Sequence, residues 1–374
     1  MPTVTDEVEQ GVVAEKLLCR RFRIAWHQVV AFFSSFMVDQ TQRVLVVYRY
    51  RENTADGGSA YERMVLDALS ESCAVDAHAI VLGGTKLGTY LRMPLEAARF
   101  RNLMASPSRY KTVIETMDAS LIPVKRAQRQ IVIVHHIGSS RDRVYAVFEE
   151  ALIRRLKASD CIVTVSKYWQ SRLVNLGFRN VRLIYNGFPI QDFNFEDGEI
   201  DRFLRCYELL GKPIVYIGNH GRYKGTRQVA ECLLGMDVHI VASGDAQSQV
   251  SGVRTLRLYR RDYLRLLRAS SLAITMSQFD EGWCRTAHEA MLCGTPVVGS
   301  GRGGMRELLE GGGQVICEKF GEFRSQVEAI LGDPLMQRSL GRTGQMFARR
   351  FSVERLRRDW VDLVTCRHPQ TRRA

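Results

Sequence analysis

Residues 272–304 read LAITMSQFDEGWCRTAHEAMLCGTPVVGSGRGG, and this stretch decides the fold. Leu272–Thr275 is a short apolar run typical of a strand buried on both faces. A loop then leads into a helix that is predicted to begin near Trp283 and to end at Gly294, which suits the left-handed turn that closes a helix. Pro296–Val298 predicts the next strand. The order strand, helix, strand is the βαβ unit of a parallel sheet.

The same alternation continues on both sides of this unit, in two series. The first series has predicted strands at 43–48, 78–82, 113–115, 130–136, 160–165 and 181–184, with helices through 69 and at 144–157 and 167–176. The second has strands at 213–217, 238–241, 254–258, 272–275, 296–298 and 314–316, then helices at 322–331, 334–349 and 353–365. We therefore predict an α/β fold of two Rossmann-like, doubly wound parallel-sheet domains that face a ligand-binding cleft.

An acidic, polar stretch at 188–211 separates the two series and predicts the interdomain linker. The predicted division is an N-terminal amphipathic helical extension at 1–40, a first Rossmann-like domain at 41–190, a linker at 191–211, a second Rossmann-like domain at 212–350, and, at 351–374, a helix that returns toward the first domain and ends in a basic tail.

The charge and the cysteines narrow the class of protein. The chain has 374 residues and a formal net charge of +13, which favours an anionic partner such as a nucleotide phosphate, a nucleic acid or an anionic membrane surface. Because basic and aromatic residues are not interleaved, we expect no nucleic-acid partner. Nine cysteines without a C-x-x-C pair indicate neither a zinc site nor a redox motif. We expect a cytoplasmic protein with reduced thiols.

Residues 1–40 leave three interpretations open. Acidic residues Asp6, Glu7 and Glu9 precede the first apolar run, which is not the layout of a signal peptide. The longest uncharged run, Ile24–Val38, is shorter than the roughly 20 residues that a membrane span needs. A basic cluster before a broad apolar face is typical of a helix that lies on the inner, anionic face of a membrane. The same pattern fits a helix packed on the domain, or an upstream start that is not used.

Two carboxylates carry the predicted chemistry. Glu281 falls in the loop beyond a strand C-terminus, and Glu289 lies about two helical turns further on, so both face the same side. Such a pair can hold two separate hydroxyl clusters of one ligand. The backbone N–H groups of Trp283, Cys284 and Arg285 open the helix and suit an anion such as a pyrophosphate. A solvated pair at a helix start is the alternative, which the flanking residues 290–296 disfavour.

Two further features adjoin this segment. Gly303-Gly304 offers a second close approach of backbone to a ligand. His135 and His136 end the strand predicted at 130–136, and alternation along a strand lets only one of the two point into the cleft. A histidine at this place is either a satisfied structural group or a functional one.

The sequence resembles glycosyltransferase family 4, which comprises retaining enzymes of the GT-B fold. The spacing Glu-x7-Glu followed by Ala-Met-Leu-Cys-Gly-Thr-Pro-Val-Val looks like the signature of that family. Looser matches extend the resemblance over about residues 43–365, and they are Asp56-Gly57-Gly58, Val163–Ser166, Ile184–Gly187, Tyr216–Gly218, Lys224-Gly225 and Phe351–Glu354.

The resemblance implies roles for particular residues. Glu289 would hold the donor ribose, and Glu281 with the amides that follow it would hold the transferred sugar and the phosphates. Lys224, with Arg222, would neutralise the leaving diphosphate, and His135 would lie near the sugar, with His136 as the alternative. The implied donor-binding residues are Gly57, Gly58, Gly218, Asn219, Lys224, Glu281, Gly282, Trp283, Cys284, Arg285, Glu289, Gly303 and Gly304.

The implied activity is metal-independent transfer of a hexosyl unit from a nucleoside-diphosphate sugar, which is a co-substrate rather than a cofactor. The second domain would bind this donor, and the first would bind a saccharide or lipid-linked acceptor of cell-envelope or exopolysaccharide synthesis. We expect no metal site, since the chain has no Asp-x-Asp.

The chain departs from the family pattern at Asn219, where the family has arginine. Cys284, Arg285 and His288 replace small apolar residues, and we expect the preference for the donor sugar to depend on these three. A sugar-nucleotide epimerase or phosphorylase of the same fold, and a catalytically silent basic binding protein, are the alternative functions.

Overall fold

The computed structural model describes residues 43–49, 57–80, 95, 98–99, 110–117, 119–121, 129–137, 153–154, 156–219, 223–244 and 250–365. The predicted extension at 1–40, most of the helix predicted at 144–157, Asp56 and Arg222 lie outside this part of the chain. The interpretations given for them stay predictions. Within the described residues, no helix is long and apolar enough to cross a membrane.

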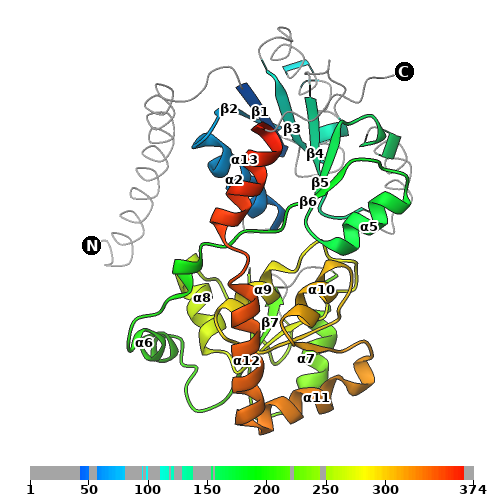
Figure 1. Ribbon diagram of the computed structural model, residues 1–374. Coiled ribbons are helices and arrows are strands. Elements are labelled where there is room, and N and C mark those ends of the chain that lie inside the picture. The colour runs from blue at the N-terminus through cyan, green and yellow to red at the C-terminus, as the bar shows by residue number, and fades with distance from the viewer. Residues whose placement is uncertain are drawn as a thin grey trace.

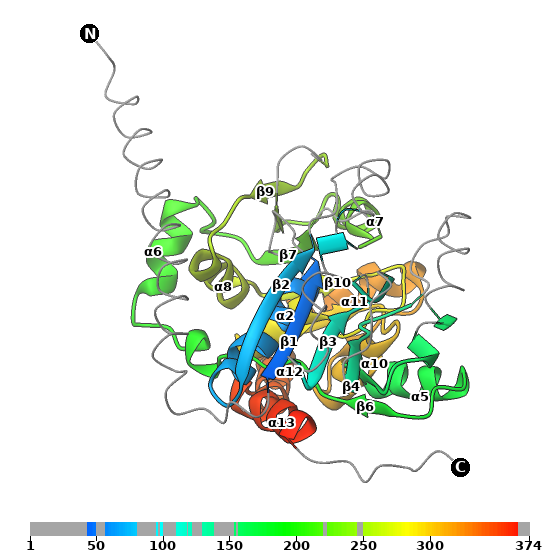
Figure 2. The same cartoon turned by 90° about the horizontal axis from the view of Figure 1, so that it is seen from above.

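The first sheet has six parallel strands in the order β2-β1-β3-β4-β5-β6. They are β1 (Arg43–Arg49), β2 (Ala74–Ile80), β3 (Thr112–Thr116), β4 (Arg129–Ile133), β5 (Cys161–Thr164) and β6 (Val181–Leu183). Seen from above, β2, β1, β3 and β4 lie side by side in this order (Figure 2). Ile131 and Ile133 pack in one core cluster, whereas Val132 and Val134 pack with α5 (Lys167–Asn175), so helices cover both faces.

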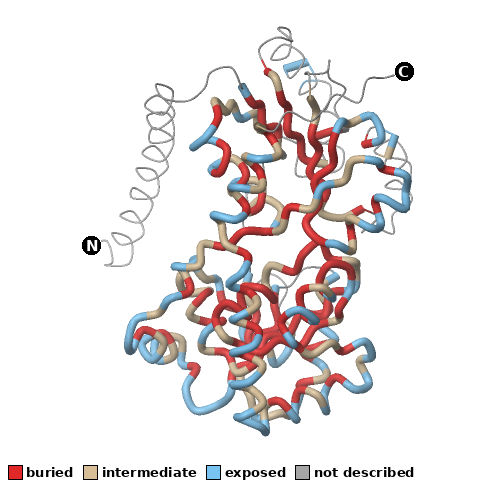
Figure 3. The backbone as a smooth tube through the Cα atoms, in the orientation of Figure 1, coloured by how far each residue is buried: buried red, intermediate tan, exposed pale blue. Residues whose placement is uncertain are grey.

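The second sheet also has six parallel strands, in the order β12-β11-β10-β7-β8-β9. They are β7 (Ile214–Asn219), β8 (His239–Ser243), β9 (Arg254–Leu256), β10 (Leu272–Thr275), β11 (Val297–Gly299) and β12 (Val315–Ile316). The helices around it are α7 (Thr226–Leu233), α8 (Arg260–Ala269), α9 (Arg285–Leu292), α10 (Gly304–Gly311), α11 (Phe320–Gly332) and α12 (Pro334–Ala348). Strands and inner helix faces are buried in both halves (Figure 3).

The chain crosses twice between the two sheets. The first crossing, residues 184–190, is called the crossover segment below, and it leads into η2 (Ile190–Phe193) and α6 (Glu199–Cys206). The second crossing runs from α12 into α13 (Val353–Thr365), which packs beside α2 (Gly57–Ser70) of the first sheet (Figure 1). The indole Nε1 of Trp360 donates to the hydroxyl of Tyr61 at 3.1 Å, and both residues are fully buried.

The two crossings are hydrogen-bonded to each other. The amide of Phe188 donates to the carbonyl of Phe351 at 2.9 Å, and the amide of Val353 donates to the carbonyl of Phe188 at 3.1 Å. A Cβ on Gly187 would lie 2.9 Å from the Cβ of Leu356, so only glycine allows this approach. One continuous apolar cluster consequently runs through both halves of the molecule.

Several predicted boundaries differ from the structure. Strand β2 begins at Ala74 rather than at His78, and β4 ends at Ile133 rather than at His136. The stretch predicted as a linker contains η2 and α6, because the buried carboxylate of Glu199 accepts hydrogen bonds from Arg261 and Arg265 on α8 and fixes it to the second domain. Gly57 and Gly58 belong to the first turn of α2.

Candidate active site

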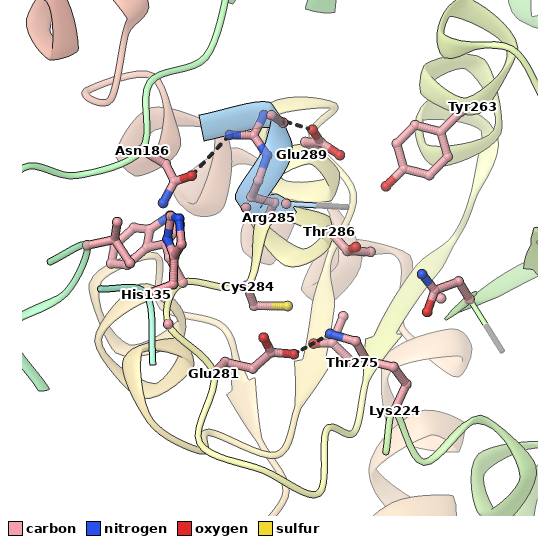
Figure 4. Close-up of a pocket in the computed structure, with 18 of the residues that line it drawn as sticks. His135, Asn186, Lys224, Tyr263, Thr275, Glu281, Cys284, Arg285, Thr286 and Glu289 are labelled. Carbon is pink, nitrogen blue, oxygen red and sulfur yellow. Dashed lines mark hydrogen bonds and ion pairs between the residues drawn. The ribbon is translucent and has the colours of Figure 1, made fainter. Parts of the chain in front are cut away.

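A cavity of about 1560 Å³ lies between the two halves, at the carboxyl ends of strands from both sheets. The predicted site residues that line it are Gly57, Gly58, His135, His136, Gly218, Asn219, Lys224, Glu281, Gly282, Trp283, Cys284, Arg285 and Glu289. The structure therefore brings together residues up to about 230 positions apart in the sequence. Figure 4 shows the central part, with His135 and Asn186 from the first half facing Glu281, Cys284 and Arg285 from the second.

Glu281 and Lys224 form an ion pair at one end of this part of the cavity. The Nζ of Lys224 donates to Oε1 of Glu281 at 2.5 Å, and the hydroxyl of Ser277 donates to the same oxygen at 2.5 Å. Burial alone would lower the pKa of Lys224, but the adjacent Glu281 carboxylate outweighs it and the pKa is raised. The ammonium also lies 5.0 Å from the ring centroid of Phe279. Lys224 is thus a fixed cation with its charge retained.

Glu289 occupies the other end, on α9, and is held by two arginines. Its Oε1 is 2.9 Å from a guanidinium nitrogen of Arg260 and 3.5 Å from one of Arg285. The carboxylate side chain is only 6% exposed. Tyr263 lies on the same side of the cavity (Figure 4) and contributes to its lining. The two carboxylates are consequently separated along the cavity, each with its own cationic partner.

The start of α9 lies between the two carboxylates. Cys284 is the N-cap residue, with extended backbone and no hydrogen bond from its side chain to the helix. The first N–H groups of a helix lack intrahelical partners and favour an anion. Burial raises the pKa of the Cys284 thiol to about 12, so the thiol is neutral at pH 7 and adds no negative charge here. The helix start and the Lys224 ammonium both line the cavity, and each is suited to an anion such as a phosphate.

Gly303 and Gly304, which were expected to approach a ligand, are not among the residues that line the cavity. Gly303 forms a parallel bridge with Glu281, and the amide of Gly304 donates to the carbonyl of Glu281 at 2.8 Å. A Cβ on Gly304 would lie 2.0 Å from the carbonyl oxygen of Gly282 and 2.6 Å from Oγ of Ser166. The glycines therefore support the loop that carries Glu281.

The same loop is attached to the first half of the molecule. The indole Nε1 of Trp169 donates to the carbonyl of Glu281 at 2.9 Å, and the hydroxyl of Tyr168 donates to the Asp280 carboxylate at 2.8 Å. A Cβ on Gly282 would lie 2.6 Å from the carbonyl oxygen of His135. Glu281 is thus positioned by both halves of the molecule.

His135 and His136 both line the cavity, which corrects the prediction that only one of them faces it. That prediction used strand alternation, but β4 ends at Ile133 and the two histidines lie in the bend beyond it. The ring of His135 contacts Tyr61 edge-on with centroids 5.2 Å apart, and the ring of His136 is 5.7 Å from that of Phe279.

His288 does not line the cavity, so the expectation that it helps to select the donor sugar was wrong. Its Nδ1 accepts from the indole of Trp283 at 3.1 Å, and its Nε2 donates to the carbonyl of Ala348 at 3.0 Å. The ring stacks on Phe188 with centroids 4.0 Å apart. Burial lowers the pKa of His288 to about 3, so the imidazole is neutral and structural.

Sequence reasoning missed Arg260, Tyr263, Tyr216 and Ser277, which line the cavity. Arg260 and Tyr263 belong to the start of α8, which follows β9. The rule that ligands bind beyond strand C-termini points to this loop, and it would have found both residues if it had been applied to the second sheet strand by strand.

The comparisons with known proteins agree with this architecture. Residues 254–346 match the family model described as glycosyl transferases group 1. This matched segment lies in the second of two parallel sheets that face a cavity, an arrangement shared with the solved structures that superpose on this chain. The chain has the GT-B fold.

One curated relative and two solved structures are similar to this chain. An uncharacterized glycosyltransferase of Methanocaldococcus jannaschii, MJ1178, is 24% identical over 213 residues, which are 53% of this chain and 57% of that protein. The chain therefore matches little more than half the length of this curated relative. Sucrose-phosphate synthase from Thermosynechococcus elongatus superposes with a TM-score of 0.71 at 18% identity, covering 86% of this chain and 98% of the other. Anabaena HepE in complex with UDP and glucose superposes with a TM-score of 0.69 at 17% identity, covering 86% of this chain and 99% of the other.

Proposed function

We propose that this protein is a glycosyltransferase of family 4 that moves a hexosyl unit from a nucleoside-diphosphate sugar to a hydroxyl of a saccharide or lipid-linked acceptor. The observation that carries the proposal is the cavity in which Lys224, Glu281, Glu289 and the start of α9 lie together, opposite His135 and His136. The donor occupies the second half and the acceptor occupies the first. A place in cell-envelope or exopolysaccharide synthesis follows from the resemblance alone.

The donor lies along the cavity with its ribose at Glu289. A carboxylate accepts hydrogen bonds from neighbouring hydroxyls, and the Arg260 guanidinium holds the Glu289 carboxylate in place at 2.9 Å. The diphosphate lies at the start of α9 beside Lys224, where N–H groups and an ammonium complement its charge. The transferred sugar reaches the Glu281 carboxylate and the histidines. The HepE structure, which has a similar fold, is a complex with UDP and glucose, and this supports a nucleotide-sugar ligand for the present chain.

The reaction proceeds with retention of configuration at the anomeric carbon. The acceptor hydroxyl attacks from the face on which the diphosphate departs, so that a bond from its oxygen to the anomeric carbon forms as the bond to phosphate breaks. The proton of the hydroxyl passes to the departing phosphate. Lys224 and the α9 amides stabilise the negative charge that develops there, which is the task of a metal ion in metal-dependent transferases.

A donor screen tests the proposal. Purified protein is incubated with UDP-, GDP- and ADP-sugars, and nucleotide release and sugar transfer are followed by mass spectrometry. We expect one nucleotide class to be hydrolysed slowly without acceptor and faster with a saccharide mixture. A Glu289→Ala variant should bind that donor at least about tenfold more weakly, the loss of one charged hydrogen-bonding group. No turnover of any donor, or an unchanged affinity of the variant, contradicts the proposal.

A further inference from the structure

Three parts of the molecule meet at Arg285. Its guanidinium donates to Oδ1 of Asn186 at 3.1 Å, lies 3.5 Å from Oε1 of Glu289, and lies 4.4 Å from the ring centroid of Phe188. Asn186 and Phe188 belong to the crossover segment. A Cβ on Gly57, in the first turn of α2, would lie 3.0 Å from Cδ of Arg285. Figure 4 shows the Arg285 side chain between Asn186 and Glu289.

The position is unusual because the charge is buried. The Arg285 side chain is 13% exposed, and burial lowers its pKa although Glu289 opposes this. An arginine stays protonated in a protein, so a buried guanidinium must keep its partners. If the Glu289 carboxylate moves, Arg285 follows it, and its contacts with Asn186 and Phe188 change as a result.

Resting on the proposed function, we propose that Arg285 is a positioning residue that couples nucleotide binding at Glu289 to the crossover segment and the start of α2. The ribose hydroxyls compete with the guanidinium for the Glu289 carboxylate. When Arg285 loses its contact with Glu289, its contacts with Asn186 and Phe188 on one side and with Gly57 on the other change as well. The acceptor-side wall of the cavity is thereby set by donor occupancy, and the coupling is reciprocal.

Arg260 shows why this role belongs to Arg285. It approaches the same oxygen of Glu289 more closely, at 2.9 Å, but its guanidinium packs on Tyr263 and Phe193, at 5.7 and 6.0 Å from their ring centroids. Its side chain is 46% exposed. Arg260 thus holds Glu289 from the donor side, whereas Arg285 joins Glu289 to the segment that connects the two halves.

Hydrogen exchange followed by mass spectrometry tests the coupling. The probe is whichever of uridine, guanosine or adenosine diphosphate raises the Tm of the wild-type protein most. We expect it to protect two regions from exchange. The first region is the expected direct contacts with the ligand, at 214–219 and 257–263, and the second is the crossover segment at 184–190. In Arg285→Lys and Arg285→Met the direct protection should remain, while ligand-dependent protection of 184–190 should fall about fivefold or more. Lysine keeps the charge but not the planar fork.

Two further variants make the result decisive. Arg268→Met removes an arginine that caps the other end of α9, through the carbonyl of Cys293 at 2.9 Å, and should leave the protection of 184–190 unchanged. Asn186→Ala removes the hydrogen bond that Arg285 donates to the crossover segment. It should also lower the ligand-dependent protection of 184–190, and it tests the coupling if the Arg285 variants do not fold. Retained protection of 184–190, or equal loss in both regions, overturns the coupling. If no diphosphate raises the Tm of the wild type, the proposed function fails first.

Discussion

At the scale of single residues, the candidate site consists of two carboxylates, Glu281 and Glu289, each held by a cationic side chain. Glu281 and Glu289 could be predicted from the sequence because their spacing and surroundings are local. The ion pairs that they form could not, because Lys224, although itself expected in the site, and Arg260 lie 57 and 29 positions upstream and reach Glu281 and Glu289 only through the fold. Likewise, His288 looked like part of the site because it stands between the two carboxylates, yet its place on α9 turns it toward Trp283 and Ala348.

Replacing Lys224 by methionine tests the cation of the leaving-group site. The variant keeps the length and packing of the side chain but removes the charge beside the start of α9. We expect kcat to fall about 100-fold or more, the cost of losing one stabilising group at a developing charge. Steady-state kinetics with the donor found in the screen measure it.

Lys212→Met is the matched control for this substitution. Lys212 pairs with Asp237 at 2.6 Å on the surface, and its side chain is half exposed. Its loss should leave kcat unchanged. An equal effect of the two substitutions would show that the loss at Lys224 reflects general damage to the protein.

At the scale of elements, the strands and most helices could be predicted because buried parallel strands are continuous apolar runs, and ten of the twelve predicted strands match within two residues at each end. The exceptions are β2 and the relation of His135 and His136 to the end of β4. An apolar run that continues beyond the last hydrogen bond between two strands contains no residue that marks where the strand pairing ends. The helix α6 was missed because its apolar face is short and its anchor is the charged Glu199.

Gly304→Ala tests the support of the loop that carries Glu281. The added Cβ would lie 2.0 Å from a backbone oxygen of Gly282, and backbone cannot move aside without displacing Glu281. We expect a lower Tm and a loss of activity greater than the loss of donor affinity. Gly321→Ala is the control, because nothing lies within 4 Å of a Cβ there. That helical substitution should be neutral or stabilise by up to about 1 kcal/mol.

Glu199→Gln tests the anchor of α6 on α8. Burial would raise the pKa of Glu199, but hydrogen bonds from Arg261, the Glu196 amide and Arg265 lower it to about 2. The stabilisation is therefore complete above the unfolded pKa near 4.5 and is lost as the pH falls from there toward 2. Urea unfolding at pH 7 should show a loss of about 1–3 kcal/mol. The variant should also have a flatter stability profile below pH 4.5, and an identical profile would refute the anchor.

At the scale of the whole molecule, the two crossings tie the sheets into one core. The aromatic side chains of Phe188, Trp283, His288 and Phe351 pack together where the crossings meet. The two-domain GT-B architecture could be predicted from the sequence, since alternation and the second-half motif specify it. The packing at the crossings could not, since it depends on how residues near 188 and 351 meet in space.

His288 gives this junction a pH dependence. Burial depresses its folded pKa to about 3, against about 6.5 in the unfolded chain. The unfolded state therefore binds more protons between these values, and stability should decline as the pH falls below about 6.5. In His288→Gln, whose amide can donate to the carbonyl of Ala348, the decline between pH 6.5 and 5 should be weaker. Denaturant unfolding across this range measures it, and parallel curves would exclude His288 as the source.

The hydrogen bond between Trp360 and Tyr61 spans 299 positions of the chain. A ribosome that adds about 5–20 residues per second needs about 15–60 seconds to make the second partner after the first. Throughout that interval α13 is not yet available to cover the side of α2 on which it packs in the finished protein. The first half of the molecule is therefore completed only when α13, the last helix, has been made. During synthesis we expect chaperone binding and misassembly to concentrate at the apolar side of α2 that α13 later covers.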